Sequence, residues 1–397
     1  MNKPCRLLTG VALAAFLPRA YPAQAQLLTP TSAPMQDWVS VAVSGDGARL
    51  AAVGSYGWLY LSTNSGVNWT PAVTSPSGSE PYRPWTGVAS SADGNELVAV
   101  CNFLPIFCSM NAGESWNQRG PATLWSSATV SANGTVMAAA DNNEGSIYIS
   151  RDHGATWVAS GAPHRRWRSI VSSGDGGTLF AGADTGTSLV EVAGIYVSTN
   201  SGVTWTITSA PPSPWQALAL SADGGKVAAG SYGGPVYLSA DSGGHWSSTP
   251  LPNLHWGGLA SSADGVHLVA VASEGVIYTS NDSGRTWTKA SAPAASWQTV
   301  ACSSDGLKLF AGAWNDPTGG IYAAQLAPKL SIFASQSGPV ISWPNSAEGF
   351  SLEQSPDILT RNWQPVAIAP TVVSGQNQVA ITLIGGTSAY RLVRRQQ

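Results

Sequence analysis

Residues 38–69 read WVSVAVSGDGARLAAVGSYGWLYLSTNSGVNW, and this stretch decides the fold. Its short apolar runs are separated by glycine-containing turns, of which Asp46-Gly47 suits a tight hairpin because both residues tolerate positive φ. Similar units begin at tryptophans spaced 40 to 48 residues apart: Trp38, Trp85, Trp125, Trp167, Trp215, Trp256 and Trp297. A repeat of about 40–45 residues with four strand-like pieces is typical of a β-propeller blade. The pattern therefore predicts an all-β chain with seven blades.

The first run of each unit predicts the innermost strand of a blade. Alternation along it places Trp38, Ser40 and Ala42 on one face of the strand. Val39 and Val41 then belong to the opposite face. The residue two positions after each tryptophan is small: Ser40, Gly87, Ser127, Ser169, Ala217, Gly258 and Thr299. Small side chains would allow the inner strands to crowd around a central axis.

The third run ends in the most specific motif of the chain, Ser62-x-Asn64-x-Gly66-x-x-Trp69. Five further copies, with Asn or Asp at the second named position, end at Trp116, Trp157, Trp205, Trp246 and Trp287. The Asn or Asp oxygen can accept nearby backbone N–H bonds, and glycine permits a left-handed residue. The tryptophan would pack back across the hairpin.

This repeat resembles that of the BNR or Asp-box propellers, which include sialidases, xyloglucanases and photosystem-assembly-type propellers. The resemblance covers about residues 27–326. It implies that the box lies on the turn between the third and fourth strands, away from the ligand face. A structural role for the box follows from that placement.

Six boxes accompany seven first strands, because the last unit, residues 297–325, stops after its third strand. Residues 27–32 match the expected position of the missing strand. We therefore expect a seven-bladed propeller over residues 26–327 that is closed by an N-terminal strand.

The two ends of the chain differ from the repeats. Residues 1–25 have basic Lys3 and Arg6, a short apolar run and the small-x-small sequence Ala23-Gln24-Ala25, which together indicate a secretory signal peptide. Residues 328–397 resemble the small β-sandwich tails of extracellular bacterial proteins. We expect a bacterial protein exported to the periplasm, cell surface or medium, monomeric and without a transmembrane segment.

Composition narrows the choice of ligands. Charged residues are 10% of the chain and the formal net charge is −3. This acidic balance argues against a nucleic-acid partner, because phosphate binding needs clustered Lys and Arg. The five histidines are scattered, and we expect no metal and no cofactor. Cys101 and Cys108 could form a cross-strand disulfide or remain free, and both alternatives are open. For Cys302 we expect an inert buried thiol.

Features present in one unit, rather than in all, are candidates for ligand binding. They fall in loops between second and third strands or between units, which form the functional face of propellers. The candidates are Tyr56, Tyr82, Arg83, Phe103, Arg165, Arg166, Arg168, Tyr232 and Trp314. Exposed aromatic rings and arginines favour a glycan or protein ligand. We therefore predict a secreted, non-catalytic binding propeller.

Two alternatives remain open. One is a divergent glycoside hydrolase, for which two carboxyl groups on the ligand face would be needed. The carboxylates available there are Asp141, Glu144, Asp184, Glu191, Glu274 and Asp316. The sialidases resembled here use three separated arginines and an Arg-Ile-Pro motif, but this chain lacks the motif and its arginines at 165, 166 and 168 are clustered. The other alternative is a structural or assembly role on the cell surface.

Overall fold

A computed structural model describes residues 28–74, 82–184, 193–314 and 320–326 of a large unit, Ala25–Leu326. In a second unit, which contains Ala327–Gln397, it describes residues 328, 330–335, 338–344, 350–355, 363–373, 376–381 and 389–394. The predicted signal peptide lies outside the described residues. Within these ranges the regular structure is entirely strands, and no helix is long and apolar enough to cross a membrane.

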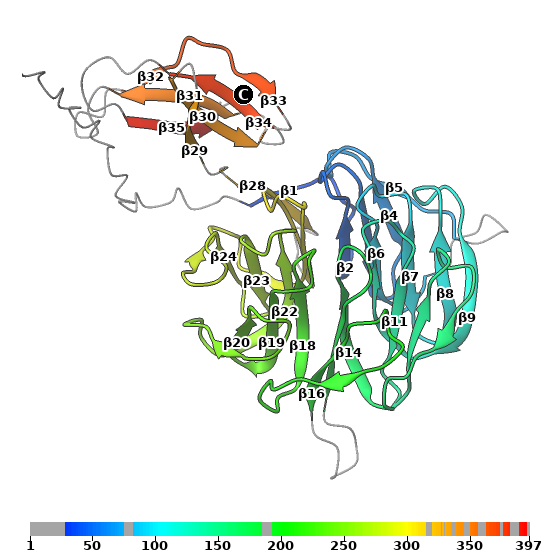
Figure 1. The fold of residues 1–397 in the computed structure, drawn as a ribbon. Helices are drawn as coiled ribbons and strands as arrows, with labels where there is room; N and C mark the ends of the chain where they lie inside the picture. Colours follow the sequence, from blue (N-terminus) through cyan, green and yellow to red (C-terminus); the bar gives the residue numbers. More distant parts are fainter. Residues whose placement is uncertain are drawn as a thin grey trace, which may run out of the picture. The chain divides into compact units, whose positions relative to one another are not determined.

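The large unit begins with four antiparallel four-stranded sheets, each ordered as in the sequence (Figure 1). The first contains β2 (Trp38–Val43), β3 (Leu50–Gly54), β4 (Leu59–Ser62) and β5 (Thr70–Pro71). The second contains β6 (Trp85–Ser90), β7 (Leu97–Cys101), β8 (Leu104–Ser109) and β9 (Asn117–Thr123). The third contains β10 (Trp125–Val130), β11 (Met137–Asp141), β12 (Ile147–Ser150) and β13 (Val158–Ala159). The fourth contains β14 (Arg166–Ser172), β15 (Leu179–Asp184), β16 (Gly194–Ser198) and β17 (Thr206–Ile207).

The next two sets of four strands are joined. They are β18 (Trp215–Leu220), β19 (Val227–Gly234), β20 (Val236–Ser239) and β21 (Ser247–Ser248), followed by β22 (Leu254–Ser261), β23 (Leu268–Ala272), β24 (Val276–Ser280) and β25 (Thr288–Lys289). They form one eight-stranded sheet because β19 also pairs with β22, with Tyr232 opposite His255 and Gly234 opposite Leu254.

The last sheet of this unit joins its two ends. It contains β26 (Ser296–Cys302), β27 (Lys308–Trp314), β28 (Ile321–Gln325) and β1 (Thr29–Pro30). Thr29 lies opposite Ala323 and Pro30 opposite Tyr322, within the segment that the sequence predicts to supply this strand. Leu28, just before β1, is buried and its N–H donates to the carbonyl of Ser291.

Backbone hydrogen bonds link the turns that follow the first strands. Each turn residue donates its N–H to the carbonyl of the corresponding residue in the next sheet, at 2.7–2.9 Å. The order of donors is Gly45, Ala92, Ala132, Gly174, Ala222, Ala263 and Ser304, and Ser304 donates back to Gly45. Among the described residues these bonds therefore form a closed ring.

A β-bulge follows the tryptophan of every first strand. In β2, Trp38 lies opposite Gly54 and Ser40 opposite Val53, so the residue between them is extra. The bulge shifts the alternation by one position, and Trp38 packs in one cluster with Val41 while Ala42 packs with Val39 on the other face. The predicted grouping of Trp38 with Ser40 and Ala42 is therefore wrong.

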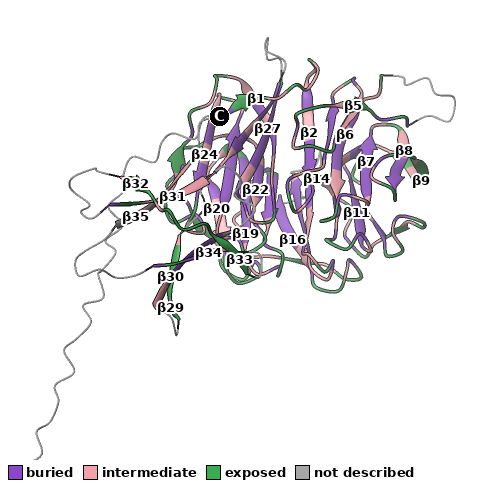
Figure 2. Ribbon diagram, turned by 90° about the horizontal axis from the view of Figure 1, so that it is seen from above, coloured by how far each residue is buried: buried purple, intermediate pink, exposed green. Residues whose placement is uncertain are grey.

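The repeated tryptophans belong to the buried core of the large unit, and Figure 2 shows buried residues along its strands. All seven are 3% exposed or less. Each contacts an aromatic ring of the third strand at centroid distances of 5.1–6.3 Å: Tyr60, Phe107, Tyr148, Tyr196, Tyr237, Tyr278 and Tyr322. These shared aromatic residues serve packing, which is worth several kcal/mol per buried ring.

The small residues of the first strands have a second purpose besides crowding. The Ser40 hydroxyl accepts from the N–H of Val88 at 3.1 Å, and the Thr299 hydroxyl accepts from the N–H of Val41 at 3.1 Å. These bonds cross between neighbouring sheets. Where the position is Gly258, an added Cβ would lie 3.1 Å from the backbone nitrogen of Val300, so the sheets approach too closely for a side chain.

The repeated Ser-x-Asn/Asp-x-Gly-x-x-Trp motif forms the same turn in all six copies. In the first, the Ser62 hydroxyl accepts from the N–H of Gly66 at 3.0 Å, and Asn64 Oδ1 accepts from the N–H of Asn68 at 2.8 Å. The indole N–H of Trp69 donates to the carbonyl of Gly66 at 3.1 Å. The motif satisfies its own polar groups, which supports a structural role.

The C-terminal residues form two antiparallel sheets. One contains β29 (Ser331–Ser335), β30 (Gly338–Pro344), β34 (Gln376–Ala380) and β33 (Thr371–Val373). The other contains β32 (Gln364–Pro365), β31 (Phe350–Ser355) and β35 (Ala389–Arg394). Ile341, Trp343, Leu352 and Val379 are buried, so this part of the chain has apolar packing of its own.

Candidate functional site

Exposed aromatic rings mark one end of the large unit. Within its described residues, every exposed Tyr, Phe or Trp side chain lies in or beside a loop between second and third strands or a connector between sheets. Their exposed fractions are 73% for Tyr56, 73% for Tyr82, 71% for Phe103, 58% for Tyr232 and 39% for Trp314. The sequence comparison between units selects the same five residues.

Four exposed apolar side chains belong to adjoining turns of the first two sheets, and we call them the apolar sector: Met35, Tyr56, Tyr82 and Phe103. Met35 is 69% exposed, and the four are the most exposed large apolar side chains described in the large unit. Sequence reasoning missed Met35, because it precedes the first repeat.

Backbone contacts bring these turns together. Gly57 and Arg83, each adjacent to a sector residue, form an isolated antiparallel bridge with two N–H···O bonds of 3.2 Å. The Gln36 side chain, beside Met35, donates to the Trp58 carbonyl and accepts from the Trp58 N–H, both at 3.1 Å. The N–H of Asn102, beside Phe103, donates to the carbonyl of Pro84 at 3.1 Å.

Two residues of the sector have an unusual backbone conformation. Tyr56 has φ 49° and Phe103 has φ 66°, in the left-handed region. Bulky residues rarely adopt this region because Cβ approaches the following carbonyl, and the strain is of order 1–3 kcal/mol. Glycine would fit both turns with less strain, so folding alone does not explain the aromatic residues there.

The base of the sector is aromatic and partly buried. Phe107 is fully buried and meets Trp85 edge-on at 5.1 Å, while the Arg83 guanidinium carbon lies 5.0 Å from the Phe107 ring centroid. Tyr82 contacts Trp58 edge-on at 6.2 Å. The buried Nε of Arg83 has no hydrogen-bond partner in the described chain.

A second group, which we call the charged corner, consists of Tyr232, His255 and Glu274. His255 Nδ1 lies 2.5 Å from Glu274 Oε1, and its backbone N–H donates to both carboxylate oxygens at 3.0 and 3.2 Å. The Tyr232 and His255 ring centroids are 4.3 Å apart. Desolvation raises the pKa of Glu274, but the hydrogen bonds from His255 outweigh it and the pKa is lowered.

The predicted basic cluster is partly neutralised. Arg168 donates through Nε and Nη2 to Asp184 Oδ2 at 3.2 and 2.8 Å. Arg166 lies opposite Asp184 in the β14–β15 ladder. Arg165 forms a backbone bridge with Gly145, and its Nη1 donates to the carbonyl of His164 at 2.8 Å.

The structure brings together Tyr56, Tyr82, Arg83 and Phe103 among the predicted site residues. Tyr232 belongs to the charged corner, and Trp314 ends β27 opposite Ser296. Sequence reasoning did not single out His255, because a single histidine carries no motif. The only sequence feature that could have pointed to His255 is the carboxylate of Glu274, 19 residues further on.

The described candidate carboxylates hold local structure. Asp141 is buried and accepts from the Thr123 hydroxyl at 2.9 Å and the Asn143 N–H at 2.8 Å. Asp184 and Glu274 hold Arg168 and His255. Glu144 occupies a positive-φ turn, with φ 54°. Glu191 and Asp316 lie outside the described residues.

Cys101 and Cys108 are free, so the disulfide alternative is wrong. Cys108 lies opposite Val98, three residues before Cys101, and the two thiols belong to different packing clusters on the two faces of the sheet. A disulfide would have to pass through the sheet. Burial raises the pKa of each thiol to about 12.

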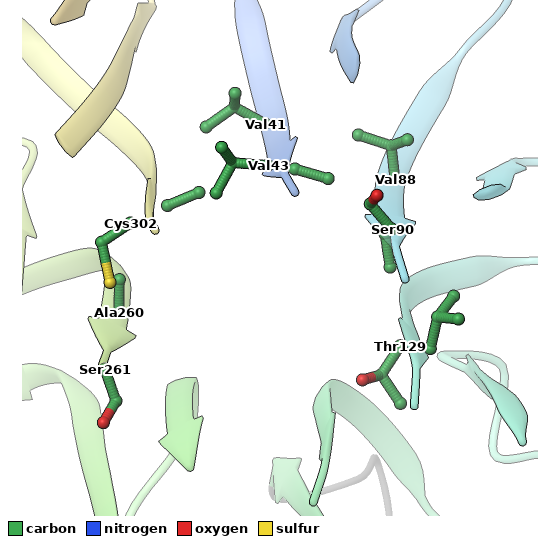
Figure 3. A pocket seen from close by; sticks show the side chains of 12 residues that line it. Val41, Val43, Val88, Ser90, Thr129, Ala260, Ser261 and Cys302 are labelled. Atoms are coloured by element: carbon green, nitrogen blue, oxygen red, sulfur yellow. The ribbon is translucent and has the colours of Figure 1, made fainter. Parts of the chain in front are cut away.

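An open cavity of about 240 Å³ lies between the ends of the first strands (Figure 3). Its lining is apolar or hydroxylated and includes Val43, Val88, Ser90, Thr129 and Cys302. Cys302 is half-buried and lines this cavity instead of lying wholly within the packed core. Burial raises the pKa of its thiol to about 12. Among the described residues no group of three or more metal-ligating side chains is found.

No protein-family model and no curated protein matches the chain. It is similar in structure to YCF48 bound to D1 peptide, with a TM-score of 0.56, 17% identity, and coverage of 75% of this chain and 96% of that one. It is also similar to YCF48 from Cyanidioschyzon merolae, with a TM-score of 0.56, 15% identity, and coverage of 76% and 98%.

A third similar structure is the GH74 xyloglucanase from Xanthomonas campestris, with a TM-score of 0.57 and 13% identity. The match covers 82% of this chain but only 60% of that one. These structures are β-propellers, so the large unit has a propeller fold.

Proposed function

We propose that this protein is a binding module that holds a protein partner through the apolar sector and performs no catalysis. The observation that carries the proposal is the pair Tyr56 and Phe103, two exposed aromatic residues at left-handed backbone positions. Strain of this kind persists where a function requires the side chain. A surface that presents aromatic rings at an energetic cost to folding is a binding surface.

The chemistry of the sector favours a protein over a sugar. Met35 and Phe103 have no conventional hydrogen-bonding group, whereas sugar hydroxyls need polar partners when water is removed. Aromatic residues, Met and Arg are enriched in protein interfaces, and Arg83 lies between the sector turns. One structural neighbour, YCF48, is described as bound to a peptide, which makes a peptide segment a reasonable partner for this propeller as well.

The glycoside hydrolase alternative gains no support from the geometry. Asp141, Asp184 and Glu274 each hold a neighbouring group, and the likeness to the xyloglucanase extends to the fold alone. An inert scaffold at the cell surface would not require strained aromatic turns.

The finer architecture belongs to the same proposal. We assign the closed hydrogen-bonded ring to seven blades of the Asp-box type, completed by β1. Residues 328–397 would form a small β-sandwich. Residues 1–25 would direct export of a bacterial chain, which would then work as a monomer in the periplasm, on the cell surface or in the medium.

Selection from a displayed library of random 12-residue peptides tests the proposal. Peptides that bind the protein should be apolar and lose at least about thirtyfold in affinity when Tyr56, Tyr82 and Phe103 are all changed to Ser. The matched control changes three exposed apolar residues elsewhere, Val158, Val203 and Ile207, to Ser. Equal binding by the sector variant would refute the assignment. Sugar release from fluorogenic glycosides, lost in Asp184→Asn or Glu274→Gln, would refute the absence of catalysis.

A further inference from the structure

The charged corner has a backbone held from two sides. The N–H of Tyr232 donates to the carbonyl of Pro214 at 3.0 Å, and Tyr232 lies opposite His255 where β19 pairs with β22. The N–H of Ser273 donates to the carbonyl of His255 at 3.0 Å, which ties the Glu274 turn to the same strand. Within the described strands, this is the only ladder that joins two complete sets of four strands of the large unit into one sheet. The corner is therefore preorganised.

The hydrogen bonds fix which imidazole nitrogen faces a ligand. The Glu274 carboxylate can only accept, so His255 Nδ1 donates to it and carries the proton. In the neutral ring Nε2 is then an acceptor. A Cβ at Gly233 would lie 3.7 Å from Nε2, so the missing side chain leaves space beside this nitrogen.

The aromatic part of the corner is accessible. Tyr232 is 58% exposed, although its ring meets the His255 ring at an interplanar angle of 61°. The His255 and Glu274 side chains are 45% and 36% exposed. An aromatic surface therefore lies beside an imidazole acceptor and a carboxylate.

A sugar ring has the complementary chemistry. Its C–H face is apolar and packs on aromatic rings, and its hydroxyl groups donate hydrogen bonds to nitrogen and carboxylate acceptors. A carboxylated sugar would meet the like charge of Glu274, whereas a neutral sugar would not. A purely apolar peptide would leave the polar atoms of the corner without partners.

We propose that Tyr232, His255 and Glu274 form a second binding site, for a neutral carbohydrate ring. Tyr232 supplies the stacking surface, and His255 and Glu274 accept bonds from ring hydroxyls. This site is separate from the apolar sector and does not require a protein partner there.

Binding to an array of neutral and acidic glycans, followed by titration calorimetry with the best neutral oligosaccharide, tests the site. We expect Tyr232→Leu and His255→Phe each to weaken binding at least about tenfold. Phe103→Leu, which removes a more exposed ring elsewhere, should leave carbohydrate binding unchanged. A melting temperature near that of the wild type establishes that each variant is folded.

Three outcomes would overturn the site. They are no binding of any neutral glycan by the wild type, binding confined to acidic glycans, and full binding by folded Tyr232→Leu. Peptide binding by the apolar-sector variant tests the protein-binding proposal, and glycan binding by the corner variants tests the carbohydrate site. Failure of one proposal can therefore be distinguished from failure of the other.

Discussion

The apolar sector and the charged corner are built on the same kind of loop but hold their side chains in different ways. In the sector, Tyr56 and Phe103 are presented by strained turns above buried Phe107. In the corner, Tyr232 and His255 are held by a strand ladder and a carboxylate. The repeated strands thus set where a loop begins, and the loop residues determine which chemistry is presented.

The largest expected effect concerns the buried tryptophans next to the two regions, Trp85 and Trp256. We expect them to stabilise the protein by similar amounts. Trp85→Ala beneath the sector and Trp256→Ala beneath the corner should each lower the free energy of unfolding by about 3–5 kcal/mol, because both indoles are buried. Urea denaturation measures this. Tyr82→Ala is the exposed control. A loss below about 1 kcal/mol for either tryptophan would show that its sheet is not part of the common core.

The next prediction concerns a hydrogen bond that one of these two tryptophans makes and the other lacks. The Trp256 indole N–H donates to the Gly234 carbonyl at 2.8 Å, whereas the Trp85 indole N–H has no partner in the described chain. Trp256→Phe should therefore destabilise the protein by about 1 kcal/mol more than Trp85→Phe. Urea denaturation of both variants gives the difference. Equal losses would mean that this bond does not support the corner.

Acidification should distinguish the two proposed binding regions. Because the pKa of Glu274 is lowered from 4.5, its ionised form contributes above that value and its contribution is lost as pH falls through the lower folded pKa. Carbohydrate affinity should then fall by about two- to fivefold, as for an exposed pair. Calorimetry from pH 7 to pH 3.5 measures it. Peptide binding should stay nearly constant, and Glu274→Gln should lessen the acid loss of carbohydrate affinity, of which the neighbouring imidazole of His255 contributes the rest.

The smallest effect has the opposite sign. Tyr56→Gly should raise the free energy of unfolding by about 0.5–1 kcal/mol, because relief of left-handed strain exceeds the added freedom of the unfolded chain. Tyr82→Gly is the matched control, since Tyr82 is equally exposed but lacks a positive φ. The Tyr82→Gly substitution should lower the free energy of unfolding by about 0.5–1 kcal/mol. A loss at both positions would show that the Tyr56 turn is unstrained.

Much of the fold could be predicted from the sequence because the repeats restate the same local rules. The tryptophan spacing, the Asp-Gly turns and the missing strand of the last unit all depend on short stretches. The bulge after Trp38 could not be predicted, because alternation shows no sign of an extra unpaired residue. The same difficulty affected Cys101 and Cys108, since their faces depend on the register between β7 and β8.

The candidate site could be predicted in part. Comparison between units found the exposed rings of Tyr56 and Phe103, because an aromatic residue in one loop and not in others has no shared packing role. The backbone strain at these residues was not evident from residue type. The corner was found only in part: Tyr232 and Glu274 were separate candidates, and the meeting of Tyr232 with His255 depends on the pairing of β19 with β22, which belong to different units.

The closed ring of turn hydrogen bonds has a consequence for how the molecule comes apart. An open array of repeats has two ends, and its terminal units can fray while the others remain folded. The ring of bonds from Gly45 around to Ser304 has no terminal member. Unfolding of one set of four strands would therefore expose both neighbouring sets, whereas fraying at the end of an open array exposes only one. Unfolding should therefore be concerted over the whole ring, and amide exchange at these turns should proceed at one common rate.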